Sequence, residues 1–112
     1  MLPRAPAREC ATAAEHYWEG LGVDVDVWND YTSHFNSQRS ECLIRVTHSV
    51  VTGRRVIVDD DIENAVDRTR VANRHEDSDA SKKTDSVVIS GSPFPSDQRA
   101  AQQQWLDDLM RK

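Results

Sequence analysis

Three side chains in the first half of this chain could act together in catalysis: Asp30, His34 and Cys42. A cysteine becomes a nucleophile when a histidine takes its proton and a carboxylate orients that histidine. No signature of a catalytic cysteine surrounds Cys42, however, and a cysteine that opens an apolar strand face more commonly belongs to a core. We therefore expect no catalytic residue and no enzyme. The alternative is a small ligand-binding protein or enzyme that uses this His/Cys/Asp site.

The two cysteines, Cys10 and Cys42, are also the candidate disulfide, because the chain has no others. A bridge would close a loop of about 33 residues and stabilise the fold by roughly 3 to 4 kcal/mol in the chain-entropy model. The alternative is two separate buried thiols that pack as small hydrophobic groups. An oxidising compartment favours the bridge, and a reducing one favours the thiols.

Acidic residues are frequent, and two groups of them resemble cation sites. Asp24, Asp26 and Asp30 suggest a calcium loop, but its fifth position would be Trp28 rather than an oxygen ligand. These aspartates fit a solvated strand face better. The three aspartates at 59–61 are more typical of a helix start, where negative charge meets the positive end of the helix dipole. Since the four histidines form no zinc motif either, we expect no metal and no cofactor.

The elements that would position these side chains begin with a helix. Residues 1–8 contain two prolines and no periodicity, which predicts a loose tail. Beyond the tail, apolar residues recur at helical spacing, and Gly20 and Gly22 then end the helix. The predicted apolar stripe consists of Cys10, Ala14, Tyr17 and Leu21.

An antiparallel hairpin over residues 42–58 is the clearest strand prediction. Apolar and polar residues alternate from Cys42 onward, Gly53 marks a turn, and residues 56–58 are the returning strand. The strict alternation of valine and aspartate at 23–28 predicts a further strand.

Between residue 59 and the last strand the pattern is less regular. A helix is favoured for 59–74, because Asp60 with Glu63 resembles a capping box, and a strand is the alternative. Residues 75–86 have no aliphatic side chain larger than alanine, so their burial cannot offset the entropy of ordering, and we expect a mobile loop. Residues 87–89 are a short buried strand.

A second helix closes the chain, with Ser96 as its N-cap. Its predicted apolar stripe consists of Ala101, Trp105 and Leu109, widened by Leu106 and Met110. Residues 1–112 are thus expected to form one α+β domain. In it, a small antiparallel sheet carries the N-terminal and C-terminal helices on one face.

Net charge and hydropathy limit the classes of partner. The 112 residues carry a formal net charge of -5, which disfavours binding to nucleic acid or anionic lipid. No apolar run approaches the ~20 residues of a membrane span. The first eight residues have no apolar leader core, so a cytoplasmic location is expected for the chain as it stands, and an exported or periplasmic one if a leader is missing.

The first two thirds of the chain resemble a family of small uncharacterised bacterial domains, many of them exported or lipoprotein-like. In these proteins an aromatic residue and an asparagine precede, by five residues, a cysteine that opens a strand, as 34–36 (His-Phe-Asn) precede 42–44 (Cys-Leu-Ile) here. Residues 10–18 are similar to their first helix, and the acidic segment 60–64 to one that follows their hairpin. The resemblance covers about residues 10–74.

The resemblance implies a small α+β domain, a bacterial envelope setting and a bridge between Cys10 and Cys42. It implies no activity and no catalytic residue. We therefore expect a non-catalytic module that has a structural role or binds a protein partner.

Overall fold

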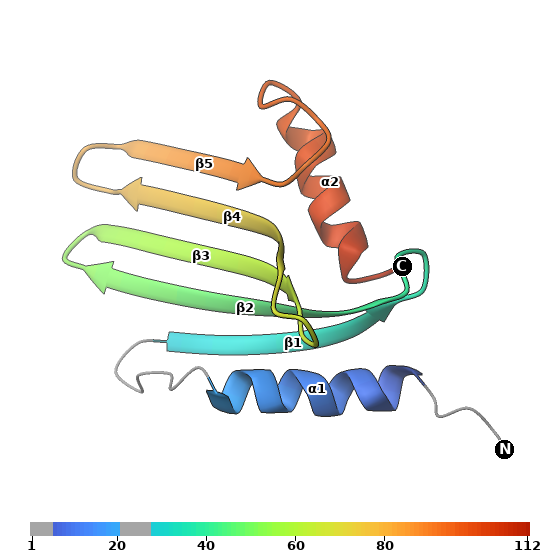
Figure 1. Cartoon of the computed structure of the whole chain (residues 1–112). Coiled ribbons are helices and arrows are strands. Elements are labelled where there is room, and N and C mark those ends of the chain that lie inside the picture. Colours follow the sequence, from blue (N-terminus) through green and yellow to red (C-terminus); the bar gives the residue numbers. More distant parts are fainter. Residues whose placement is uncertain (1–5, 21–27) are drawn as a thin grey trace, which may run out of the picture.

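A computed structural model of the protein describes residues 6–20 and 28–112. Within these ranges the chain forms one five-stranded antiparallel sheet and two helices, so the predicted α+β class is confirmed (Figure 1). The strands lie in the sheet in sequence order. The elements are α1 (Pro6–Gly20), β1 (Trp28–Asn36), β2 (Glu41–Thr52), β3 (Arg55–Asn64), β4 (Arg70–Asp79), β5 (Thr84–Ser90) and α2 (Arg99–Leu109).

Helix α1 begins earlier than the sequence predicts. Pro6 opens it, since a proline at the first helical position gives up an N–H that has no partner within the helix in any case. Residues 6–8, expected in the loose tail, therefore belong to the helix, and residues 1–5 lie outside the described part. The predicted stripe is confirmed as far as it can be followed: Cys10 and Ala14 are buried and Tyr17 is half-buried.

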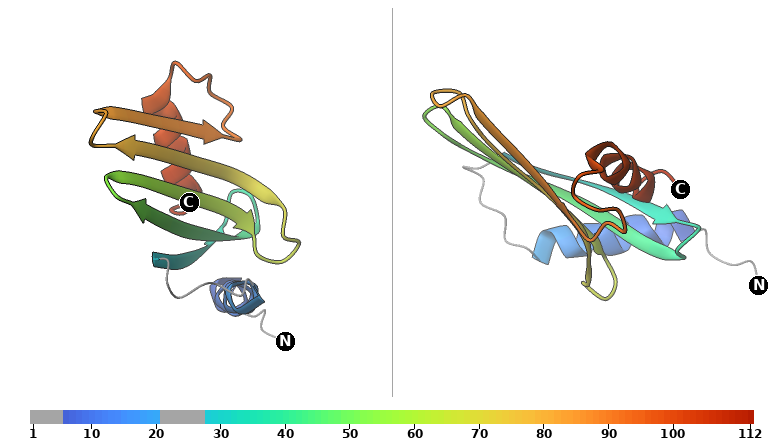
Figure 2. Two further views of the ribbon diagram at one scale, coloured as in Figure 1. Left: turned by 90° about the vertical axis from the view of Figure 1, so that its left-hand side faces the viewer. Right: turned by 90° about the horizontal axis from the view of Figure 1, so that it is seen from above.

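The two helices lie on opposite faces of the sheet, not on one face as expected. Successive residues of a strand point to opposite faces. Cys42 and Ile44 of β2 pack with α1, whereas Leu43 between them packs with α2. Figure 2 agrees, because the right-hand view shows the sheet nearly edge-on between the helices. The prediction was wrong because the start of β2 has apolar side chains on both faces. Each face is therefore buried by a different helix.

Each face consequently has its own hydrophobic core. The buried residues on the α1 side are Cys10, Ala14, Cys42, Ile44 and Ala65. Those on the α2 side are Leu43, Ile62, Ala72, Leu106 and Leu109. Trp18 stacks on Tyr31 beside the first core, with 4.8 Å between ring centroids, and Trp105 packs against the second. Both tryptophans are thus anchors of a core.

The helix favoured for 59–74 is wrong, and the alternative, a strand, is what the chain forms. Asp60 and Ile62 lie in β3, which pairs with β2 in the predicted hairpin and with β4 on its other side. Asp60 does not cap a helix. Its carboxylate instead accepts hydrogen bonds from Arg45 and Thr47 on the neighbouring strand, which favours the extended conformation.

The mobile loop expected at 75–86 is also wrong, because these residues form most of the β4–β5 hairpin. Their polar side chains are ordered by partners on β3 rather than by burial in a core. The side chain of Arg55 pairs with Asp77, with 2.6 Å between Nη2 and Oδ2, and His75 lies 2.7 Å from the carboxylate of Asp59.

Two strand boundaries differ from the predictions. Of the strand expected at 23–28, only Trp28 falls within the described residues, and β1 continues from there to Asn36. Residues 87–89, expected as a short buried strand, lie within β5, which begins earlier at Thr84, but only Ile89 is buried and Val88 is exposed.

Helix α2 is present but begins later than expected. Gln98 is its N-cap and no side chain caps it, so the assignment of that role to Ser96 was wrong. Leu106 and Leu109 of the predicted stripe are buried, and Trp105 and Met110 pack against the same core. The polar Gln102, which was not predicted, is buried as well, and its amide donates to the carbonyl of Phe94. The buried residues are Gln102, Leu106 and Leu109.

Candidate functional site

The His/Cys/Asp site considered for catalysis is not formed. Residues directly opposite each other on antiparallel strands share a face of the sheet. His34 is opposite Leu43, whereas Cys42 is opposite Phe35, so His34 lies on the α2 side and Cys42 on the α1 side. The imidazole therefore cannot reach the sulfur, and the alternative of an enzyme or ligand site built on these residues is wrong. Nε2 of His34 is buried, and no described residue hydrogen-bonds it.

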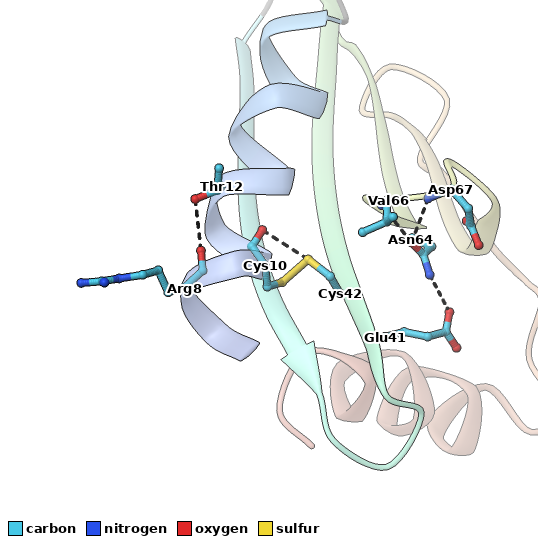
Figure 3. The surroundings of a disulfide bond; sticks show 8 residues. All are labelled: Arg8, Cys10, Thr12, Glu41, Cys42, Asn64, Val66 and Asp67. Atoms are coloured by element: carbon cyan, nitrogen blue, oxygen red, sulfur yellow. Dashed lines mark hydrogen bonds between the residues drawn. A yellow bond between two sulfur atoms is a disulfide. The ribbon is translucent and has the colours of Figure 1, made fainter. Parts of the chain in front are cut away.

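Cys10 and Cys42 instead form a disulfide between α1 and β2 (Figure 3). Their sulfur atoms are 2.16 Å apart and their α-carbons 5.1 Å apart. Sγ of Cys42 also lies 3.2 Å from the carbonyl oxygen of Cys10. Of the two roles that the sequence left open for the cysteines, the structure therefore has the bridge.

The described residues around this disulfide line a cleft of about 310 Å³. Its floor is formed by the buried disulfide and the half-buried ring of Phe35. Its rim is formed by Glu9, Glu41, Asn64, Val66 and Asp67. The rim therefore brings together the first turn of α1, the start of β2 and the β3–β4 turn.

Asn64 holds the β3–β4 turn against the start of β2. Its side-chain oxygen accepts hydrogen bonds from the backbone N–H groups of Val66 (2.9 Å) and Asp67 (3.1 Å). Its amide nitrogen donates to Glu41 at 3.2 Å, as Figure 3 shows. The backbone N–H of Ala65 also donates to the carbonyl of Cys42, at 2.9 Å. One asparagine thus holds the carboxylate of Glu41 and the backbone of Asp67 on the same rim.

The cleft is electrically negative. Three of its lining residues, Glu9, Glu41 and Asp67, are acidic, and none is a lysine or arginine. The hydroxyl of Thr69 donates a hydrogen bond to the carboxylate of Asp67 and lowers its pKa, and the backbone N–H of Thr69 adds a smaller effect in the same direction. The carboxylate of Asp67 therefore stays ionised at pH values below the usual range for an aspartate. Glu41 accepts a hydrogen bond from Nε of Arg39 at 3.0 Å, and that arginine does not line the cleft.

The acidic run at 59–61 does not converge on a cation site. Alternation along β3 sends Asp60 to the α2 side, where it pairs with Arg45. Asp59 and Asp61 point to the other side, and Asp61 pairs with Arg70. Across residues 6–20 and 28–112, no group of three or more acidic, histidine or cysteine side chains has an arrangement that could hold a metal ion.

Sequence reasoning identified the disulfide pair but missed the other residues of the cleft. The available signal was the spacing of Asn64, Val66 and Asp67, which is that of an asparagine-stabilised turn. The helix favoured for 59–74 concealed it. Phe35 and Glu41 could be placed next to this turn only from the strand register, and the sequence alone did not predict that register.

No family model matches this sequence, and no curated protein or solved structure matches it. The resemblance to small bacterial domains therefore stays a prediction. Within the described ranges, no helix has the length and apolar character needed to cross a membrane.

Proposed function

We propose that the protein is a non-catalytic protein-interaction module whose partner docks on the α1 side of the sheet, over β3, β4 and β5. The observation that carries this proposal is the uneven cover of that side. Helix α1 packs on β1 and β2, and α2 lies on the opposite face (Figure 2). Within the described residues, no helix covers much of the α1 side of β3–β5.

The uncovered surface, called the open face below, combines apolar and acidic side chains. Its members, assigned by strand register, are Ile57, Asp59, Asp61, His75, Asp77, Asp79 and Val88. Val88 is 54% exposed, which is high for a valine in a strand, and Ile57 is half-buried. The two apolar side chains lie on either side of β4, whose Asp77 and His75 separate them. A mixed surface of apolar and charged side chains is typical of a non-obligate protein interface.

Charge favours a basic partner. Of the four aspartates of the open face, Asp77 and Asp61 are paired with arginines, Arg55 and Arg70 respectively. The hydrogen bond from Arg55 lowers the pKa of Asp77, and that from Ser81 lowers the pKa of Asp79. These carboxylates are therefore ionised at neutral pH. A partner with surplus lysine and arginine would be steered to this face, with faster association at low salt.

The test uses two exposed valines on opposite faces of the sheet. The immobilised full chain is used to capture proteins from its native cells, in parallel with Val88→Glu and Val51→Glu. Val51 is 67% exposed and lies on the α2 side, which makes it the matched control. We expect a captured protein that Val88→Glu loses, that Val51→Glu retains, and that salt releases. Equal capture by both variants, or equal loss, would contradict the open face as the docking surface.

The proposal extends to a bacterial envelope setting. The sequence resemblance supports it, and so does the disulfide, since such bridges persist in oxidising compartments. Fractionation of native cells should recover the protein with the envelope or periplasm. Recovery in the cytosol with free thiols would remove this part of the proposal and leave the module itself.

A further inference from the structure

We infer that the cleft beside the disulfide binds the side chain of a lysine or arginine. This inference rests on the proposed function, because the side chain would belong to the partner that docks on the open face. It adds a specific anchoring site, with a stated ligand chemistry, to a surface that is otherwise broad.

The size of the cleft suits one side chain. Ligand pockets usually have volumes of roughly 300 to 1,000 Å³. At about 310 Å³ this cleft is at the lower limit of that range, and its rim is open. It is therefore matched to a single long side chain or a small amine rather than to a nucleotide or another large cofactor.

The floor and the rim have different chemistry, and this difference selects the ligand. The disulfide and the ring of Phe35 give an apolar floor, whereas Glu9, Glu41 and Asp67 make the rim acidic. Lysine and arginine have the complementary structure, an apolar stem with a cationic end. An acidic side chain would be repelled by the rim, and an aliphatic one would leave the rim carboxylates without a new partner.

The carboxylate of Glu41 on the rim can accept further hydrogen bonds. A carboxylate has about four lone-pair sites. Each oxygen of Glu41 receives one hydrogen bond, Oε1 from Arg39 and Oε2 from Asn64. Glu41 is thus held in position and still has acceptor capacity for an ammonium or guanidinium group.

The cleft and the open face lie on the same side of the sheet. Phe35 and Cys42 share the α1 face by register, as do Asp59 and Asp61 of the open face. One partner can therefore occupy both, with a basic side chain in the cleft and its main contact over β3–β5.

The test is a titration of the full chain, oxidised and isotope-labelled, followed by amide NMR shifts. The probes are N-acetyl-lysine methylamide, its arginine counterpart, and the neutral N-acetyl-norleucine methylamide as the matched control. We expect saturable shifts at the amides of Cys42, Val66 and Asp67 with the two cations, at millimolar concentration, and weaker shifts with norleucine. Glu41→Gln should weaken lysine binding about threefold, as expected for one partly exposed ion pair.

Two further variants keep the result interpretable. Asp67→Asn should also weaken lysine binding, and its side-chain oxygen can still accept the hydrogen bonds from Thr69 that shape the turn. Asp108→Asn, which alters a carboxylate in α2 away from the cleft, should change nothing. Amide spectra without probe show whether each variant is folded.

The outcomes separate this inference from the proposed function. Equal binding of lysine and norleucine, or no saturable shift at the cleft, would overturn the inference. If Val88→Glu still abolished capture in that case, the interaction module would stand without its anchor. Specific lysine binding with no loss of capture in Val88→Glu would instead retain the cleft as a cation site and overturn the open face.

Discussion

At the scale of single residues, the turns of this sheet follow one rule. One or two residues before each returning strand the backbone is left-handed, with φ of 52° at Ser40, 63° at Gly53, 63° at Arg68 and 53° at Lys83. Only one of these four is a glycine, the residue that takes this conformation without steric cost. The other three positions are therefore strained by their side chains.

Replacement of Lys83 by glycine should stabilise the protein. The relief of strain is about 1 to 2 kcal/mol, and the added freedom of the unfolded chain offsets about 0.4 to 1 kcal/mol of it. A net gain of roughly 0.5 kcal/mol is expected from these two terms. Urea denaturation of Lys83→Gly measures it, and Gly53→Ala, which adds strain at another turn residue with positive φ, should shift the midpoint the opposite way. A lower midpoint for Lys83→Gly would show that its side chain contributes more than the strain costs.

Reduction of the disulfide should lower the free energy of unfolding by about 3 to 4 kcal/mol, the value for a loop of this length. Helix α1 should stay docked after reduction, because Ala14, Tyr17 and Trp18 still pack in the core on that side of the sheet. Denaturation with and without reductant gives the difference. The Cys10→Ser and Cys42→Ser double variant should be as unstable as the reduced protein and insensitive to reductant. An unchanged midpoint on reduction would mean that the bridge is absent from the folded protein in solution.

The ion pair between Arg55 and Asp77 should make stability depend on pH. Because Arg55 lowers the pKa of Asp77 in the folded state, the pair stabilises the fold at pH values above the unfolded carboxyl pKa and is lost as the pH falls through the folded value. Asp77→Asn should therefore lower the melting temperature at pH 7, and the difference from the wild type should close toward pH 3. Arg55→Gln should behave in the same way. A difference that does not change with pH would assign the effect to packing.

At the scale of elements, a strand could be predicted from the sequence when apolar residues mark it, but not when its polar side chains are held by residues of another strand. The β2–β3 hairpin was predictable because apolar alternation and Gly53 both mark it. The β4–β5 hairpin was not, since its polar side chains are ordered by β3 and its turn has Lys83 in place of glycine. Residues 59–64 were misread as a helix start because Asp60 and Glu63 happen to have the spacing of a capping box.

The candidate site was predictable only in its covalent part. A chain with two cysteines allows only one intramolecular disulfide, and the helix and the strand that contain them were both predicted. The rest of the cleft comes from Phe35 in β1 and Asn64 at the end of β3, which only the register brings near the disulfide. Side-chain pattern predicts which residues are buried, but it does not determine which strand positions stand opposite each other.

At the scale of the whole molecule, strand β2 carries both cores. Leu43 and Ile44 are consecutive and completely buried, each under a different helix. The helices do not need to touch to depend on one another, because both pack on the same strand.

This arrangement predicts a separable response to core truncation. Leu43→Ala and Ile44→Ala should each cost about 2 to 5 kcal/mol through lost burial and the cavity left behind. Hydrogen exchange should then rise first in α2 for Leu43→Ala and first in α1 for Ile44→Ala. A chain in which both variants raise exchange equally in both helices would have one cooperative core instead of two.

The sequential order of the strands governs how a newly made chain can assemble. Every strand pairs only with its neighbours in sequence. Each hairpin can therefore form by closing one short turn, which costs little loop-closure entropy. The bridge, in contrast, joins α1 to β2 across the whole of β1. The sheet can therefore form before Cys10 and Cys42 are oxidised. The disulfide then links the amino-terminal helix covalently to a strand that is already paired.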